Sequence, residues 1–383
     1  MVNIGDVSPR SSNFDHGDET KGKATLVLVD LAPVGFRGVA LRIGVLTAGG
    51  DAPGLNAAIR AIGQMAIRDG HEVIGIANGW AGLATEFAGK PLLANDLQGV
   101  IAQGGTLLGT ARYNLNDPPG GRERVLAAIH DHLDALISIG GDGTHRISSW
   151  LAEHGAPIVG VPKTLDNDLL GTDYCIGFDT AISIVAESLD RLYTTAASHH
   201  RVMVVETMGR LTGWVAAMGG LAGGADMIVI PEFPVTMNEI MAHLERRVAA
   251  GLAFSIVVVA EGVNLETLGG IEKGELSMEG VGGVRLATRG VGQFVASKIE
   301  ELTDIEVRTT VLGHLQRGGS PTAHDRIWAT RVGAAAYEAV IAGKYGTIPV
   351  VRDNNVVLVP ITTVIGGQRQ VPRELYELCS VFF

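Results

Sequence analysis

From Arg42 onward the chain alternates short apolar runs, rich in valine and isoleucine, with longer stretches of helical periodicity. Runs without polar alternation are typical of strands buried on both faces, and intervening helices provide the crossovers of a parallel sheet. The predicted strands are 42–46, 72–76, 135–139, 157–161, 202–206, 227–230, 255–260 and 307–312. The predicted helices include 55–69, 180–193, 237–250, 290–302 and 325–341. We therefore predict an α/β fold whose mainly parallel sheets are covered by helices.

Most of these predicted strands end in polar loops that contain glycine. The loops read TAGGDAPG, GGDGT, PKTLDND, TMGR, AEG and GHLQRGG. In open α/β sheets, ligands bind beyond the carboxyl ends of the strands. One such loop alone is better explained as a good turn, but several at the same topological edge favour a shared site.

Length, charge and cysteine content restrict the class of protein. A chain of 383 residues suggests two domains, and a net charge of −11 without a basic stripe argues against nucleic acid or anionic membranes as main partners. A few converging arginines would still bind a phosphorylated small molecule. No uninterrupted apolar stretch approaches the ~18 residues of a membrane span. Cys175 and Cys379 match no metal or redox spacing, which favours a reduced, cytoplasmic compartment.

Residues 1–40 differ from the rest because they are polar and lack a core pattern. They also lack the regions of a signal peptide, so we expect an appended, loosely ordered extension. One hypothesis is that translation begins downstream, at VALRIGVL.

Two glycine-rich loops resemble phosphate-binding turns. In TAGGDAPG, Gly49 and Gly50 follow a strand and precede a helix, where backbone N–H groups can face an anion. In ISIGGDGT, Asp142 could hold a Mg²⁺ ion that bridges phosphate oxygens, Gly143 leaves room for the phosphate chain, and Thr144 is placed to cap the next helix. The alternative for the second loop is a tight turn with no ligand.

The loop PKTLDND places a cation, a hydroxyl and two carboxylates directly after a buried strand. Phosphoryl transfer needs a base on the attacking hydroxyl and cations on the moving charge. Asp166 or Asp168 could be that base, with Lys163 and Thr164 touching phosphate. The alternative is an Asp-rich loop that only caps the segment DYCIGFDTA.

Several arginines follow predicted strands or lie in these loops. A sugar phosphate with a transferring phosphoryl group needs more than one guanidinium fork. The candidates are Arg112, Arg201, Arg210, Arg308 and Arg317.

Taken together, these residues resemble the 6-phosphofructokinase family over about residues 42–345. The motifs occur in the order GGDAPGLNAAIR, GGDGT, PKTLDND, GFDTA, SHHRVMVVETMGR, PE, AEG and GHLQRGGSP. The resemblance implies two Rossmann-like three-layer α/β/α domains with the active site in the cleft between them. The nucleotide and Mg²⁺ domain would comprise 42–177 plus about 316–366. The sugar-phosphate domain would comprise about 178–315 plus the C-terminal tail.

The resemblance also implies roles for individual residues. Asp166 resembles the base that takes the proton from the C1 hydroxyl of fructose 6-phosphate, and Arg210 the cation on the transferring phosphoryl group. Thr164, Asp168 and Gly50 would support catalysis. The ATP and Mg²⁺ side would comprise Gly50, Arg112, Tyr113, Asp142, Gly143, Thr144 and Lys163, with Asp142 at the metal. The sugar-phosphate side would comprise Thr164, Asp166, Asp168, Arg201, Met208, Gly209, Arg210, Glu261, Arg308, His314 and Arg317.

The resemblance further implies a homo-oligomer, dimer or tetramer, because Arg201 and Arg308 resemble arginines that family members lend across a subunit interface. The segment 265–287 resembles an insertion relative to shorter bacterial enzymes, and we expect a surface loop or hairpin there.

The sequence motifs leave two candidates for the phosphoryl donor, ATP and pyrophosphate. Pyrophosphate-dependent members typically carry GGDD and a lysine, whereas this chain combines Gly143, the ATP-type residue, with Lys163, the pyrophosphate-type residue. A carboxylate would obstruct the α-phosphate of a nucleotide, so Gly143 favours ATP. The alternatives are a pyrophosphate-dependent enzyme, a GGDGT kinase for a lipid or dinucleotide, and a non-catalytic regulatory subunit that binds sugar phosphate.

Overall fold

The computed structural model describes residues 39–116, 119–271, 278–279, 283–284 and 289–383, the last two short pieces without their side chains. The predicted loose extension, 1–40, lies almost wholly outside the described residues. The strands are β1 (Arg42–Thr47), β2 (Glu72–Ile76), β3 (Gly89–Pro91), β4 (Ala135–Gly140), β5 (Ile158–Pro162), β6 (Val202–Thr207), β7 (Met227–Val229), β8 (Ser255–Ala260), β9 (Met278–Glu279), β10 (Gly283–Val284), β11 (Val307–Val311), β12 (Thr347–Arg352) and β13 (Asn355–Pro360).

The α-helices are α1 (Leu55–Arg68), α2 (Ala81–Ala84), α3 (Gly121–His132), α4 (Asp142–Glu153), α5 (Phe178–His199), α6 (Trp214–Ala222), α7 (Met237–Ala249), α8 (Val291–Leu302), α9 (Ala323–Ile341) and α10 (Arg373–Ser380). Short 3₁₀ turns are η1 (Val100–Ala102), η2 (Leu265–Leu268), η3 (Gly313–Arg317) and η4 (Ile361–Val364). Within the described residues, no helix combines the length and the apolar character needed to cross a membrane.

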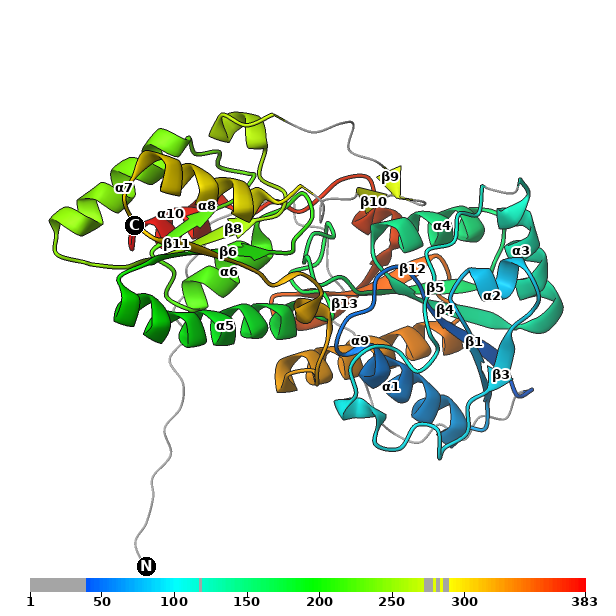
Figure 1. Ribbon diagram of the computed structural model, residues 1–383. Coiled ribbons are helices and arrows are strands. Elements are labelled where there is room, and N and C mark those ends of the chain that lie inside the picture. Colours follow the sequence, from blue (N-terminus) through cyan, green and yellow to red (C-terminus); the bar gives the residue numbers. More distant parts are fainter. Residues whose placement is uncertain (1–38, 117–118, 272–277, 280–282, 285–288) are drawn as a thin grey trace, which may run out of the picture. The chain divides into compact units, whose positions relative to one another are not determined.

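The larger sheet has seven strands in the order β13-β12-β5-β4-β1-β2-β3. Its interior pairs are parallel, and antiparallel strands close both edges. Residues of α1 and α9 pack on one face, and residues of α2, α3 and α4 pack on the other. Figure 1 shows α1 and α9 together below this sheet and α4 above it.

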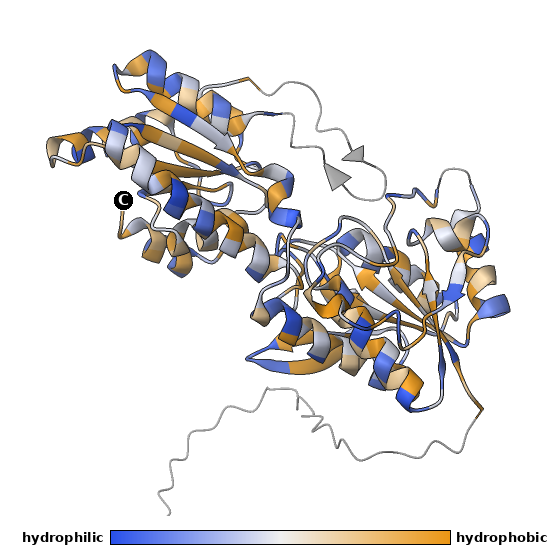
Figure 2. Cartoon of the chain, turned by 60° about the horizontal axis from the view of Figure 1, so that its bottom comes forward, coloured by the Kyte–Doolittle hydropathy of each residue, from blue (hydrophilic) through white to orange (hydrophobic). Residues whose placement is uncertain are grey.

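The smaller sheet is fully parallel, with the order β11-β6-β8-β7. In Figure 1, α7 and α8 cover one face and α5 and α6 cover the other. Every residue of β6 and β8 is buried, which is why each contains a continuous apolar run of four or five residues in the sequence. Figure 2 shows the hydrophobic residues concentrated in the strands of both sheets. The predicted fold class is therefore confirmed.

The predicted strands match the structure to within one or two residues, but three strands were not predicted. β12 and β13 form an antiparallel pair at one edge, and β3 is a three-residue strand at the other. The predicted helix 180–193 is also too short, because α5 continues to His199. In 265–287, β9 and β10 pair antiparallel, which confirms a hairpin there. Residues 272–277, 280–282 and 285–288 of that segment lie outside the described residues.

Candidate active site

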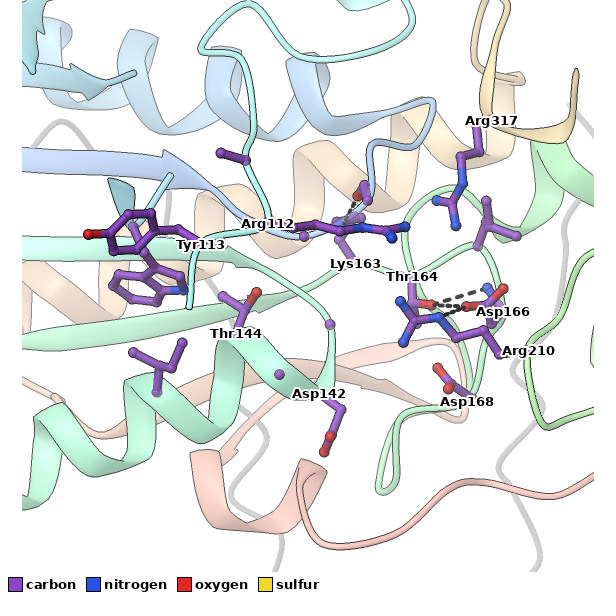
Figure 3. A pocket seen from close by; sticks show the side chains of 18 residues that line it. Arg112, Tyr113, Asp142, Thr144, Lys163, Thr164, Asp166, Asp168, Arg210 and Arg317 are labelled. Carbon is purple, nitrogen blue, oxygen red and sulfur yellow. Dashed lines mark hydrogen bonds and ion pairs between the residues drawn. The ribbon is translucent and has the colours of Figure 1, made fainter. Parts of the chain in front are cut away.

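One pocket collects side chains from loops that follow strands of both sheets (Figure 3). The strands β1, β4, β5 and β6 each contribute residues just beyond their carboxyl ends. The pocket brings together the predicted residues Gly50, Arg112, Tyr113, Asp142, Gly143, Thr144, Lys163, Thr164, Asp166, Asp168, Arg210 and Arg317.

Asp166 lies on the loop between β5 and α5, and it is only 3 % exposed. Its Oδ2 accepts a hydrogen bond from the Thr164 hydroxyl at 3.3 Å and lies 3.5 Å from Nε of Arg210. Figure 3 shows the Arg210 side chain directed at Thr164 and Asp166. The other carboxylate oxygen, Oδ1, is buried and has no hydrogen-bond partner among the described residues. Asp166 is thus held through one oxygen, and its other oxygen is left with an unused acceptor capacity.

Arg210 has a left-handed backbone conformation, with φ of 53°. A non-glycine residue in this region is strained and persists only when its surroundings fix it. The fixing contact is Glu261, whose Oε1 accepts the Arg210 amide at 3.1 Å. Glu261 is 6 % exposed and does not line the pocket, so it holds the backbone of Arg210 from outside.

The loop after β1 is held by two cations. The buried Lys163 ammonium donates to the carbonyl oxygens of Ala48 and Gly50, and the Arg317 guanidinium donates to the Asp51 carbonyl at 2.9 Å. A Cβ on Gly50 would lie 2.6 Å from Nη1 of Arg317, so a larger residue there would displace the Arg317 guanidinium. Burial, together with Arg317 and Arg210, lowers the pKa of Lys163 to about 7.

Asp142 is the first residue of α4, where negative charge is stabilised by the helix dipole. Its Oδ2 accepts a bond from Nε of Arg146 at 2.7 Å, while its Oδ1 is buried and has no partner in the part of the chain that the structure describes. The predicted cap by Thr144 is wrong, because α4 begins two residues earlier and the Thr144 hydroxyl donates instead to the Ala48 carbonyl at 3.4 Å.

A metal ion at this pocket would rely on few protein ligands. Within the part of the chain that the structure describes, no group of three His, Cys, Asp or Glu side chains has a metal-binding arrangement. Mg²⁺ needs only one or two carboxylates when phosphate oxygens and water complete its shell. The free Oδ1 of Asp142 fits such a ligand.

The alternative role for the Asp-rich loop, capping the segment DYCIGFDTA, is met by Asn167, which accepts the Cys175 amide at 2.9 Å, and not by the two aspartates. The amides of Gly177 and Thr180, at the start of α5, donate instead to the carboxylate of Asp325, at 2.6 and 2.8 Å. Asp166 and Asp168 therefore remain available to the pocket.

Two carboxyl groups near Arg210, those of Asp168 and Glu261, have raised pKa values. Burial, and next the charge of Asp166, raise the pKa of Asp168 to about 7. Burial and the same neighbour raise the pKa of Glu261 to about 7. Folding therefore favours the protonated forms of both groups, and their ionised forms destabilise the folded state.

This shift predicts that Asp168→Asn raises the melting temperature at pH 8. The folded-state pKa lies above the unfolded value, so the stabilisation from the protonated form is present at low pH. It is lost as the pH rises through about 7. The neutral amide removes that loss. Differential scanning calorimetry in EDTA at pH 5 and pH 8 measures the effect, which should be larger at pH 8.

Asp190→Asn is the matched control, since Asp190 is an exposed carboxylate on α5 outside the pocket. It should change the melting temperature little at either pH. A melting temperature of the Asp168 variant that falls equally at both pH values would contradict the assigned shift.

Several predicted site residues lie outside this pocket. Arg201 and Arg308 both pair with Glu306, and Arg308 also approaches Glu300 at 3.9 Å. His314 is exposed in η3. Met208 and Gly209 precede Arg210, and the amide of Met208 donates to the Gln316 side chain at 2.8 Å. None of these residues, nor Glu261, is part of the pocket lining.

Part of the pocket lining is apolar and was not predicted from the sequence. Trp80, which is 3 % exposed, and Ile147 line the pocket together with Tyr113. Trp80 ends the loop ANGW after β2, and a glycine-containing loop with a tryptophan at a strand end was the available signal.

Comparison with known proteins agrees with this geometry. The phosphofructokinase family model matches residues 42–340, which is most of the chain. The chain is 48% identical over 349 residues to an ATP-dependent 6-phosphofructokinase of Chloroflexus aggregans, covering 88% of this chain and 95% of the relative. It is 46% identical over 348 residues to a pyrophosphate–fructose 6-phosphate 1-phosphotransferase of Amycolatopsis methanolica, covering 90% of this chain and 100% of the relative.

Solved structures give the same result. The T-state crystal structure of Pichia pastoris phosphofructokinase superposes with a TM-score of 0.74 at 32% identity, covering 85% of this chain but only 35% of that longer chain. A pyrophosphate-dependent phosphofructokinase from Marinobacter aquaeolei superposes with a TM-score of 0.73 at 25% identity, covering 87% of this chain and 86% of that one. The chain belongs to the phosphofructokinase family.

Proposed function

We propose that this protein transfers the terminal phosphoryl group of ATP to the C1 hydroxyl of fructose 6-phosphate, with Mg²⁺, giving fructose 1,6-bisphosphate and ADP. The observation that carries the proposal is the asymmetric environment of Asp166, which has one engaged oxygen and one free buried oxygen beside Arg210. The names of similar proteins support the reaction class, because one relative is named an ATP-dependent 6-phosphofructokinase and another a pyrophosphate–fructose 6-phosphate 1-phosphotransferase.

Asp166 acts as the general base in this proposal. Its Oδ1 accepts the C1 hydroxyl proton as the new P–O bond forms, while Thr164 and Arg210 keep Oδ2 in place. The bond between the terminal phosphorus and its bridging oxygen breaks, and the electron pair leaves on ADP. Arg210 also lies close enough to the reacting carboxylate to stabilise the negative charge of the transferring group.

Asp142 would hold the metal through its free Oδ1. When bound, Mg²⁺ neutralises charge on the donor phosphates. The backbone of the Gly49–Asp51 loop is kept in position by Lys163 and Arg317. We assign the donor phosphates to this side of the pocket, because the first turn of α4 and both cations favour anions there.

The apolar wall favours ATP over pyrophosphate. Trp80, Tyr113 and Ile147 line the same pocket as Asp142 and Gly143 and give it aromatic and aliphatic surface. A nucleoside can pack against such a surface, whereas pyrophosphate has no apolar group to place there. The Lys163 ammonium is engaged by two backbone carbonyls, so its presence is explained without a pyrophosphate donor. Relatives named for either donor are about equally similar to this chain, so the assignment of ATP as donor rests on the pocket lining.

The donor assignment predicts that Trp80→Leu raises KM for ATP by about tenfold, since loss of one base–aromatic contact costs about 1–3 kcal/mol. Leucine keeps an apolar side chain at this buried position. Initial rates with varied ATP at saturating fructose 6-phosphate measure the effect, and kcat should change less than KM.

Trp150→Leu is the control, because Trp150 lies on α4 outside the pocket lining and stacks on His154. Its KM for ATP should stay at the wild-type value. An unchanged KM for ATP in the Trp80 variant would remove the apolar wall from nucleotide binding.

We also propose that the seven-stranded region binds the nucleotide and the four-stranded region binds the sugar phosphate. Arg201 and Arg308 both pair with Glu306 and do not line the pocket of their own chain. This supports a role in which they contact the sugar-phosphate site of a neighbouring subunit in a homo-oligomer. In that case the sugar-phosphate site is complete only in the assembly.

A further inference from the structure

The loop that carries Asp166 and Asp168 leaves β5 and returns beside it before α5 begins. Lys163 and Ile176 form an isolated parallel bridge, so 164–175 is a closed excursion. Near its start, between the two carboxylates, Asn167 has φ of 52°. A left-handed residue, even asparagine, is held there only by surrounding contacts.

Part of the restraint comes from within the loop. The Asn167 side chain donates to the Asp173 carbonyl at 3.3 Å and accepts the Cys175 amide at 2.9 Å. These bonds close the turn on itself, but they do not attach it to the rest of the protein.

The end of the loop, 171–173, is attached to β12, because the Val351 amide donates to the Thr172 hydroxyl and the Arg352 side chain donates to the Gly171 carbonyl. The part of the loop nearer the two carboxylates is attached by Arg369, about 200 residues later in the sequence. Its amide donates to the Asp168 carbonyl at 2.8 Å. Its Nη1 donates to the carbonyls of Asp173 at 3.0 Å and of Asn167 at 3.5 Å. One residue therefore binds three backbone oxygens of the loop, yet it does not line the pocket.

Arg369 is itself anchored on α6. The Arg369 carbonyl accepts the indole N–H of Trp214 at 2.8 Å, and its guanidinium lies 4.0 Å from the centroid of the Trp214 ring. Two residues on, the Val371 amide donates to Glu232, which also accepts the Gly213 amide at the start of α6. Trp214 is 6 % exposed, so the anchor is part of the core.

We propose that Arg369 is a positioning residue for phosphoryl transfer: with Trp214 it clamps the Asp166–Asp168 loop to α6. The proposal rests on the proposed function. A displacement of about 1 Å in a positioned catalytic group can cost about 100-fold in rate. Arginine suits the role because its planar fork can stack on an indole and donate to carbonyls at the same time, which lysine cannot do.

Arg369→Ala should lower kcat by about 30-fold while leaving KM for ATP within about twofold. The loop becomes less restrained, whereas the apolar wall formed by Trp80, Tyr113 and Ile147 is unchanged. Methylguanidinium in the millimolar range should restore several-fold of the lost kcat by refilling the space over Trp214. Arg369→Lys should resemble the alanine variant, since the ammonium cannot replace both the stack and the carbonyl bonds.

The control is Arg373→Ala. Arg373 lies in the same C-terminal segment, and its guanidinium lies 5.0 Å from the centroid of the Phe233 ring. Unlike Arg369, it is exposed, and among the described residues it donates no hydrogen bond to the 164–175 loop. Its kcat should stay at the wild-type value and should not respond to methylguanidinium.

Amide hydrogen exchange gives a readout that does not depend on turnover. In Arg369→Ala, peptides covering 164–176 should exchange faster by about tenfold, and peptides from β1 and α4 should be unchanged. An inactive wild-type protein would refute the proposed function while leaving this measurement intact. Unchanged exchange at 164–176, a kcat within twofold of wild type, or an equal loss in Arg373→Ala would each overturn the clamp.

Discussion

Asp166→Asn is expected to lower kcat for fructose 6-phosphate phosphorylation by about 1,000-fold, the middle to upper range for loss of a general base. The amide keeps the shape of the side chain, and its oxygen can still accept from Thr164, but it cannot take up the hydroxyl proton. KM for both substrates should change by less than about fivefold, because the proton acceptor contributes mainly in the transition state. Steady-state kinetics with ATP and fructose 6-phosphate measure both constants.

Asp190→Asn again serves as the control for a carboxylate-to-amide change, and it should retain wild-type kcat. An Asp166 variant whose kcat stays within about tenfold of wild type would exclude Asp166 as the base.

Gly143→Asp is expected to lower kcat/KM with ATP by about 100-fold, which corresponds to about 2.7 kcal/mol. Gly143 lies in the first turn of α4 and lines the pocket beside Asp142. A second carboxylate there crowds the α-phosphate and repels the donor, and it offsets the positive helix end. Parallel kinetics with ATP and pyrophosphate measure the change, which should be smaller for pyrophosphate because it has no α-phosphate linked to a nucleoside.

Gly143→Ala separates charge from bulk, because it adds a Cβ without a carboxylate. It should lose about tenfold or less in kcat/KM with ATP. Equal losses with both donors in Gly143→Asp would show that the residue at 143 does not discriminate between them.

The parts of the fold that the sequence predicts are those with two buried faces. β1, β4, β6 and β8 are mostly apolar because helices cover both sides of their sheets. β13 was missed because its residues are only partly buried at a sheet edge, and β12 carries Pro349 in its interior. β3 has only three residues, and its pairing with β2 leaves no apolar pattern.

The site could be predicted where loops follow parallel strands, because the topology brings those loops to one edge. Asp142, Asp166 and Arg210 meet in one pocket for this reason. The role of Lys163 could not be predicted, since a lysine after a strand does not indicate that its ammonium will turn back to the carbonyls of Ala48 and Gly50.

Arg369 was beyond the reach of sequence patterns. It follows no predicted strand, and its importance in the structure comes from backbone carbonyls that the left-handed turn at Asn167 exposes to it. Contacts of this kind depend on tertiary packing between segments far apart in the chain. No local periodicity records them.

The donor and the acceptor can be tested together in one measurement. Purified protein is supplied with fructose 6-phosphate and Mg²⁺, with ATP or pyrophosphate in parallel, and the products are followed by phosphorus NMR. We predict fructose 1,6-bisphosphate and ADP with ATP, at a rate at least about tenfold above that with pyrophosphate. Two results would contradict an ATP-dependent phosphoryl transfer to the C1 hydroxyl. One is formation of the bisphosphate with pyrophosphate but not with ATP, and the other is no bisphosphate with either donor.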